Sequence, residues 1–258
     1  MNIQEKLTKI AEDMPKVYEA GIEEGKALGK LEVGGLAKSI IDKTVTKITA
    51  EDIAGCTAIG DYGFYRCVNL TSIDMPNTIT TIGNYGFYYC PIQSINLPNI
   101  LLTIGEYAFR HCEKIASIYI PASITSIGKY AFQDTKLKTI HIEDGNNCKI
   151  LSSICRSCPT LESVHLGNGV TFIGDYAFYN CTNLKEITIP ETVTQIDNYA
   201  FGGNCAVATA TVLPTTPPTL GASAFSSKLN TLYVPLASLD AYKAATNWSA
   251  YADKMVGV

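Results

Sequence analysis

The sequence predicts an α/β protein built as a right-handed solenoid of about eight coils, flanked by an N-terminal helix and a C-terminal capping helix. The stretch IGDYAFYNCTNLKEITIP, which begins at Ile173, returns in related form from Ile82, Ile104 and Ile127. A packing unit has a physical reason to recur within one chain, whereas a catalytic motif has none. An aromatic slot recurs every 22–24 residues and is filled by Phe64, Phe87, Phe109, Phe132, Cys155, Phe178, Phe201 and Phe225.

The coil that begins at Thr171 shows what each position is expected to do. Ile173 is expected on a short extended piece, Gly174 permits a tight bend, and DYAFYNC is expected to form roughly a helical turn. Pro190 ends the strand that follows. A period of about 20–29 residues with alternating aliphatic residues is the range of leucine-rich repeats, whose coils bury their apolar side only when stacked. The inward positions of this coil are Ala177, Phe178, Leu184, Ile187 and Ile189.

Composition and charge limit the classes of function. Hydrophobic residues make up 47% and charged residues only 17% of the 258 residues, which suits an extensively buried interior. The net charge of −4 gives no electrostatic reason to bind nucleic acid or an anionic membrane. The apolar runs fall far short of a membrane span, so no membrane insertion is expected. The first residues, MNIQEKLTKIAEDMPK, carry scattered charges and do not resemble a secretory signal.

The cysteines are expected to be thiols. Nine is an odd number, which argues against a complete disulfide framework. Equivalent Cβ atoms on stacked coils lie about 4.8 Å apart, whereas a disulfide needs about 3.8 Å. We therefore expect a ladder of buried thiols three residues after the aromatic slot, formed by Cys67, Cys90, Cys112, Cys158 and Cys181.

The pattern I-G-x-Y-A-F-x-x-C-x-x-L-x-x-I-x-I-P resembles the BspA-type bacterial leucine-rich repeat over about residues 53–235. The coil KILSSICRSCPTLESVHLG departs from it, because it lacks Tyr-Ala-Phe and the proline. The resemblance implies a leucine-rich-repeat solenoid at the bacterial cell surface, binding of host or matrix proteins, and adhesion. It brings no catalytic residues, and no export signal is visible in the sequence.

Three parts of the chain are expected: a helical segment over residues 1–35, the solenoid over residues 36–235, and a helical cap over residues 236–258. Apolar residues in residues 1–31 follow a heptad spacing that Pro15 interrupts. This segment either seals the first coil or forms a short stalk through which chains associate weakly. The stretch IAEDMPKVYEAGIEEGKALG is similar to N-terminal segments of repeat proteins encoded in gut-bacterial prophages.

The C-terminal segment LASLDAYKAATNWSAYADKM has a helical pattern, and Ser238 is a plausible N-cap. An array of coils needs such a cap, because its last strand would otherwise present open hydrogen bonds and apolar surface.

Motifs that carry chemistry are lacking. The chain has no Walker, zinc-protease, hydrolase or dinucleotide-binding motif, so we expect no enzyme and no cofactor. Acids at the bend, such as Asp61, Glu106 and Asp175, are interpreted as solvated turn residues. One group superficially offers four zinc ligands, but the repeat phase turns its thiols inward and its histidine outward, so no metal is expected. This group is Cys148, Cys155, Cys158 and His165.

The candidate binding site is the outward column of the strands on the expected concave face, because the faces of a rigid scaffold carry binding. His141 and His165 fall on this column in successive coils, beside Tyr119. Stacked strands would hold their bases roughly 5 Å apart, and the pair would respond to pH between about 5 and 8 because protonating both is disfavoured. The candidate residues are Asp74, Asn96, Tyr119, His141, His165, Thr188 and Tyr233.

Two functions fit these observations. The first is a non-enzymatic module that recognises a protein or glycan through the concave strands, in surface adhesion or host interaction. The alternative is a structural or receptor-binding component of a phage-derived assembly, attached by residues 1–31. The column would also suit a sheet face that is merely solvated.

Overall fold

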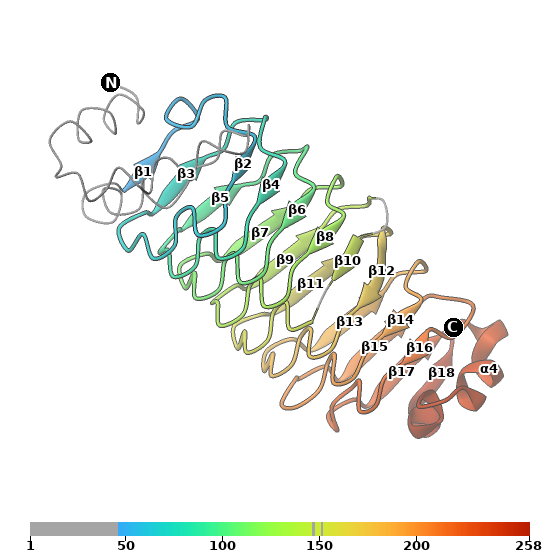
Figure 1. Ribbon diagram of the computed structural model, residues 1–258. Coiled ribbons are helices and arrows are strands. Elements are labelled where there is room, and N and C mark those ends of the chain that lie inside the picture. The colour runs from blue at the N-terminus through green and yellow to red at the C-terminus, as the bar shows by residue number, and fades with distance from the viewer. Residues whose placement is uncertain (1–45, 146–147, 151) are drawn as a thin grey trace, which may run out of the picture.

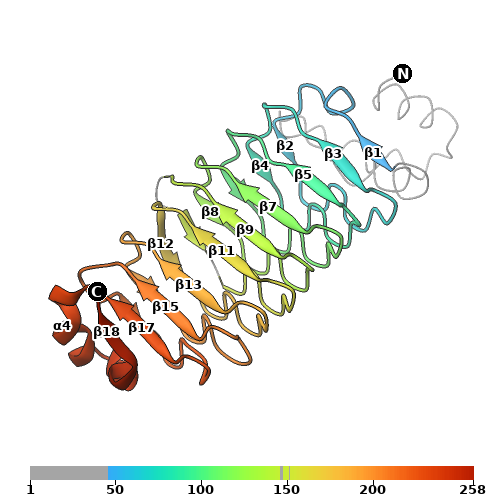
Figure 2. The same cartoon turned by 180° about the vertical axis from the view of Figure 1, so that it is seen from behind.

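The chain forms a parallel β-solenoid, and the computed structural model describes residues 46–145, 148–150 and 152–258. About nine turns stack along one axis, which runs from β1 to the C-terminal end (Figures 1 and 2). The solenoid predicted from the repeat is confirmed, with one turn more than the aromatic slots alone indicate. Among the described residues, no helix is long and apolar enough to cross a membrane.

One side of the solenoid, here called the long-strand face, carries three parallel sheets in the orders β1-β3-β5, β11-β9-β7 and β13-β15-β17-β18. Its strands are β1 (Lys47–Ile48), β3 (Ser72–Asp74), β5 (Ser94–Asn96), β7 (Ser117–Ile120), β9 (Thr139–Ile142), β11 (Ser163–Leu166), β13 (Glu186–Ile189), β15 (Thr209–Val212), β17 (Thr231–Val234) and β18 (Met255–Gly257).

A second side carries one eight-stranded parallel sheet. Its strands are β2 (Ala58–Ile59), β4 (Thr81–Ile82), β6 (Thr103–Ile104), β8 (Ser126–Ile127), β10 (Cys148–Ile150), β12 (Val170–Ile173), β14 (Gln195–Ile196) and β16 (Thr219–Leu220).

The third side, here called the turn side, consists of consecutive β-turns and corrects the expected helical turn. The N–H of Phe178 donates to the carbonyl of Ala200 in the next coil at 2.7 Å. Tyr176 and Asn180 also donate to the next coil, and both have positive φ, at 56° and 61°. A helical turn would use these N–H groups within the coil. The turns instead direct alternate N–H groups outward, so that hydrogen bonds join the coils on this side too.

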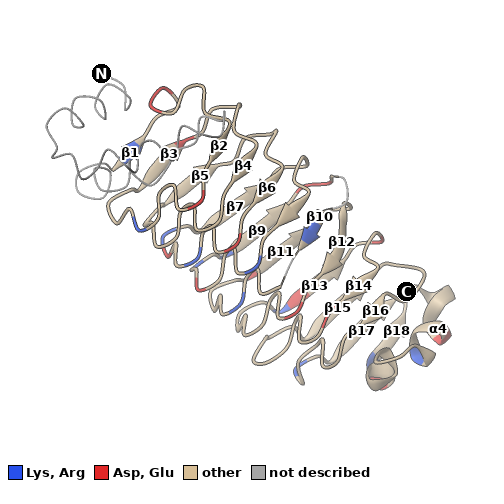
Figure 3. Ribbon diagram, in the orientation of Figure 1, with Lys and Arg blue, Asp and Glu red and all other residues tan. Residues whose placement is uncertain are grey.

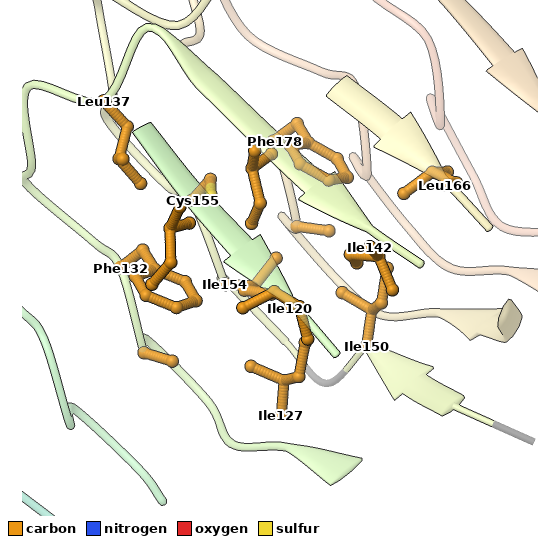
Figure 4. Packing of buried hydrophobic residues seen from close by; sticks show 14 of the residues in the cluster. Ile120, Ile127, Phe132, Leu137, Ile142, Ile150, Ile154, Cys155, Leu166 and Phe178 are labelled. Carbon is orange, nitrogen blue, oxygen red and sulfur yellow. The ribbon is translucent and has the colours of Figure 1, made fainter. Parts of the chain in front are cut away.

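The residues that the repeat predicts to point inward do form the core. The inward residues of the coil from Thr171 are buried, and Phe178 stacks on Phe201 with ring centroids 5.3 Å apart. The phenylalanine stack is interrupted at Cys155, which occupies the aromatic slot between Phe132 and Phe178 (Figure 4). Each coil therefore packs mainly on its two neighbours, and one apolar core runs along the solenoid axis.

The thiol ladder is also present. All nine cysteines are buried, and no disulfide joins them. The thiol of Cys90 donates to the carbonyl of Phe64 at 2.8 Å, and the thiol of Cys112 donates to the carbonyl of Phe87 at 3.0 Å. The thiols of Cys158 and Cys181 repeat this bond to the aromatic-slot carbonyl of the preceding coil. The cysteine slot therefore joins neighbouring coils through a buried hydrogen bond.

We predict that a purified, non-reduced sample will contain close to nine thiols when denatured, and that these thiols will react slowly in the folded protein. Burial raises the pKa of the Cys112 and Cys148 thiols to about 12, so the reactive thiolate is scarce near neutral pH. Since these pKa values are raised on folding from 9.0, this contribution to stability is present below about pH 9 and is lost as the pH rises toward 12. Thiol titration with and without denaturant tests both points. A count of one would mean four disulfides and would contradict the ladder.

The bend after the Ile-Gly pair is a tight contact between coils. A Cβ atom on Gly105 would lie 2.5 Å from the carbonyl carbon of Gly83, so only glycine fits there without a shift of backbone. Asp61 and Asp175 are not merely solvated, which corrects the interpretation from sequence. The carboxylate of Asp61 accepts a bond of 2.6 Å from the backbone N–H of Asn84, and Asp175 accepts the equivalent bond from the next coil.

The C-terminal segment closes the last coil with η3 (Leu236–Ser238), α4 (Leu239–Ala244), η4 (Trp248–Lys254) and β18. The hydroxyl of Tyr242 donates to the carbonyl of Pro214, and the indole N–H of Trp248 donates to that of Pro218, each at 2.7 Å. Both side chains are fully buried.

Two details of this cap differ from the helical expectation. The segment ends in strand β18, which pairs with β17 and so satisfies the edge that the last coil would leave open. Ser238 does precede α4, but its hydroxyl donates to the carbonyl of Thr215 at 2.6 Å and does not cap the helix. The expected N-terminal segment, residues 1–35, lies outside the described residues.

Candidate functional site

The long-strand face holds the candidate column in the predicted register. Tyr119 on β7 pairs with His141 on β9, which pairs with His165 on β11. Backbone pairing of parallel strands brings these three side chains, which come from successive coils, to one line. The period of two along each strand turns them outward while their neighbours, such as Ile140, enter the core.

The three rings form a stack at the surface. The imidazoles of His141 and His165 lie nearly parallel, with centroids 4.2 Å apart and an interplanar angle of 11°. The centroid of the Tyr119 phenol ring lies 5.3 Å from the centroid of the His141 imidazole, and the two ring planes are tilted by 35°. Tyr119 is 65% exposed. The arrangement offers an aromatic surface on which Tyr119 and His165 are exposed and His141 is half-buried.

The other predicted residues lie on the same face but in separate sheets. Asp74 pairs with Asn96 in the first sheet, and the carboxylate of Asp74 forms an exposed ion pair with Lys47 at 3.0 Å. Thr188 and Tyr233 lie in the third sheet, on either side of Thr211. The predicted column is therefore ordered as three groups, of which only the middle one holds rings in contact.

Metal-ligating residues are not gathered on this face. The described residues contain no group of three or more His, Cys, Asp or Glu side chains that could hold a metal ion. Cys155 and Cys158 are buried, and the hydrogen bond that Cys155 donates to Cys158, together with burial, raises the pKa of Cys155 well above its ordinary value. His165 lies outside on β11.

A feature that the sequence analysis did not assign lies on the turn side. The tyrosine two places after the Ile-Gly pair stacks on its equivalent in the next coil, at 4.9 Å between Tyr62 and Tyr85, 4.7 Å between Tyr85 and Tyr107, and 4.8 Å between Tyr107 and Tyr130. The sequence could have indicated this row, since the tyrosine recurs once per coil. Because each inner ring is covered on both sides by its neighbours, the row presents mainly ring edges and hydroxyls.

Arginines also contact tyrosines on the turn side. The guanidinium of Arg66 lies 5.6 Å from the ring centre of Tyr89, and that of Arg110 lies 5.5 Å from the ring centre of Tyr107. Arg110 also forms an ion pair with Asp134 at 3.1 Å. The contact of Arg66 with Tyr89 and the ion pair of Arg110 with Asp134 join neighbouring coils on the turn side, whereas Arg110 and Tyr107 belong to the same coil.

The fold defines a leucine-rich-repeat solenoid, and the exposed column presents side chains along its strands. The family model of the BspA type leucine rich repeat region matches residues 41–158 and 148–242 in six copies. The chain belongs to this family. Among curated proteins, none matches the chain at a significant level.

Several solved structures of bacterial leucine-rich repeat proteins are similar to this chain. A leucine-rich repeat protein from Bacteroides ovatus is 24% identical, with a TM-score of 0.50 over 83% of this chain and 66% of that protein. One from T. pallidum is 24% identical, with a TM-score of 0.49 over 69% of this chain and 73% of that protein. A leucine rich cell surface protein from Faecalibacterium prausnitzii is 20% identical, with a TM-score of 0.43 over 84% of this chain and 64% of that protein. The chain thus spans just under two thirds of the first and third of these proteins.

Proposed function

We propose that this chain is a non-enzymatic binding protein that recognises a protein or glycan ligand through its long-strand face, in adhesion at a bacterial surface or in host interaction. The stack of Tyr119, His141 and His165 carries the proposal. A hydrophilic sheet face has no packing reason to hold three rings in contact while leaving one of them 65% exposed. Membership of a bacterial repeat family and the cell-surface name of one similar structure support the same function.

The scaffold suits this role because the strands that carry the column are anchored by their own buried side chains. The inward residues of β7 and β9, such as Ile118 and Ile140, are buried, and on β11 Leu166 is buried. Rigid positioning reduces the conformational entropy that a ligand must remove on binding. Rings are also the side chains that contribute most often to binding energy at interfaces.

We predict that the double variant Tyr119→Ala with His141→Ala will weaken binding of any ligand found on glycan or host-protein arrays by about tenfold or more. Dissociation constants from surface plasmon resonance provide the measurement. Lys149→Ala is the matched control, because Lys149 is exposed on β10 of the eight-stranded sheet and its side chain forms no hydrogen bond or ion pair among the described residues. Equal loss in both variants would place the site elsewhere, as would loss with Asp175→Ala alone.

A further inference from the structure

The open ring of Tyr119 and its surroundings have the chemistry of a sugar site. We propose that the middle of the long-strand face binds a neutral glycan, with a pyranose ring lying on the free face of Tyr119. This inference rests on the proposed function and names its ligand class. A pyranose with equatorial hydroxyls has an apolar C–H face that packs on an aromatic ring, and a hydroxyl rim that needs hydrogen-bond partners.

The availability of a ring face distinguishes Tyr119 from the tyrosines of the turn side. The ring of His141 is the one ring in contact with Tyr119 among the described residues, and it covers one side. An inner tyrosine of the turn side, such as Tyr85, is covered by parallel rings on both sides. A sugar can therefore stack on Tyr119, whereas the inner tyrosines of the turn side offer it only edges.

Polar groups around Tyr119 are free to bind sugar hydroxyls. Asn96 on β5 and the hydroxyls of Ser117, Thr139 and Ser163 lie on this face, and no side-chain hydrogen bond involves them among the described residues. Elsewhere the repeat uses its hydroxyls internally. The hydroxyls of Thr78, Thr80, Ser123, Thr125, Thr192 and Thr194 all donate to carbonyls of the preceding coil.

The absence of charge here favours a neutral ligand. Strands β5, β7, β9 and β11 carry no Asp, Glu, Lys or Arg, whereas Asp74 lies on β3 and Glu186 on β13 (Figure 3). The exposed Lys138 and Glu162, which directly precede β9 and β11, have opposite charges and so leave no net charge at this edge. Strands without charged side chains offer no ion pair to an acidic glycan or a charged protein segment that lies over them. Four strands at about 4.8 Å spacing span roughly 14 Å, which is room for more than one sugar unit.

The test uses the full chain on an array of neutral β-linked gluco- and N-acetylgluco-oligosaccharides, with sialylated and uronate-containing glycans as charged comparators. Affinities for the neutral oligosaccharides that bind are then measured by calorimetry. We expect Tyr119→Ala to weaken binding by about tenfold, because the ring platform is lost. Tyr119→Phe should stay within about twofold, since the ring face remains. Asn96→Ala should also weaken binding, because a hydrogen-bond partner is lost.

Tyr199→Ala serves as a matched aromatic control. Tyr199 is 38% exposed on the turn side and stacks on Tyr176 at 5.2 Å, so its loss should leave glycan binding unchanged. Binding of charged glycans only, binding equal in Tyr119→Ala and the natural chain, or no glycan binding at all would each overturn the inference. A protein ligand that requires Tyr119 and His141, found without any glycan, would overturn this inference and leave the proposed function standing.

Discussion

Phe178→Ala is expected to lower the free energy of unfolding by about 3–5 kcal/mol, which is the usual cost of emptying a buried aromatic site. Phe178 is fully buried, and its ring stacks on Phe201 at 5.3 Å. The coil on its other side already has the smaller Cys155 in the aromatic slot (Figure 4). Two adjacent coils would then lack the ring, so the cavity would have a phenylalanine, Phe201, on one side only. Denaturant unfolding followed by circular dichroism measures the change.

Phe172→Ala is the matched control for this prediction. Phe172 lies on β12, six residues before Phe178, and is half-buried on the outer face of the eight-stranded sheet. Its truncation leaves no enclosed cavity, and we expect a loss of about 1 kcal/mol or less. A loss below about 1 kcal/mol for Phe178→Ala, or equal losses for the two variants, would mean that the aromatic slot is not a core position.

The inward phase of the coils could be predicted because it depends on spacing alone. Ile187, Ile189 and Phe178 recur with the coil, and burial of a recurring apolar position is the one way in which every coil can contribute to a shared core. The same spacing placed His141 and His165 next to each other, since parallel strands in register align equivalent residues. For these residues a local pattern determines a contact between distant parts of the chain.

Contacts that depend on the backbone of the next coil could not be predicted in this way. DYAFYNC resembles a helical turn by composition, but its N–H groups bond to the next coil, and no spacing in the sequence shows that choice. The role of Asp61 was missed for the same reason, because its partner is the backbone of Asn84, which any residue could supply. The tyrosines Tyr85 and Tyr107 recur in the same way as the histidines, but their stacking depends on a turn with positive φ rather than on a strand register, and the sequence did not show that turn.

The cap was predicted as a helical end, and its final strand was not. Residues 255–257 follow a short run with helical character, so their pattern alone continues that run. The edge of β17 needs hydrogen-bond partners, and this requirement of the assembled solenoid draws Met255–Gly257 into the sheet. The cap therefore acts through both packing and backbone pairing, which leads to the second large effect.

Trp248→Ala is expected to cost about 3–5 kcal/mol, and the loss should be concentrated at the C-terminal end. The indole is fully buried, contacts Phe225 and Tyr242, and donates its N–H to the carbonyl of Pro218. Its removal opens a cavity and leaves a buried carbonyl without its partner. Since each coil contacts only its neighbours, the last coils should open before the rest. Hydrogen exchange measured by mass spectrometry should show lost protection in β15 and β17 while β7 and β9 stay protected.

Two variants separate the causes of this effect. Trp248→Phe keeps a ring in the site and loses the hydrogen bond, so its cost should be smaller, about 1–2 kcal/mol. Lys243→Ala, an exposed change in α4, should leave exchange unchanged. Uniform loss of protection along the whole solenoid in Trp248→Ala would mean that the coils unfold as one cooperative unit, and unchanged protection in β17 would mean that β18 pairs without the indole. The first result would contradict the view that each coil is stabilised mainly by its two neighbours. The second would contradict the view that Trp248 holds the cap on the last coil.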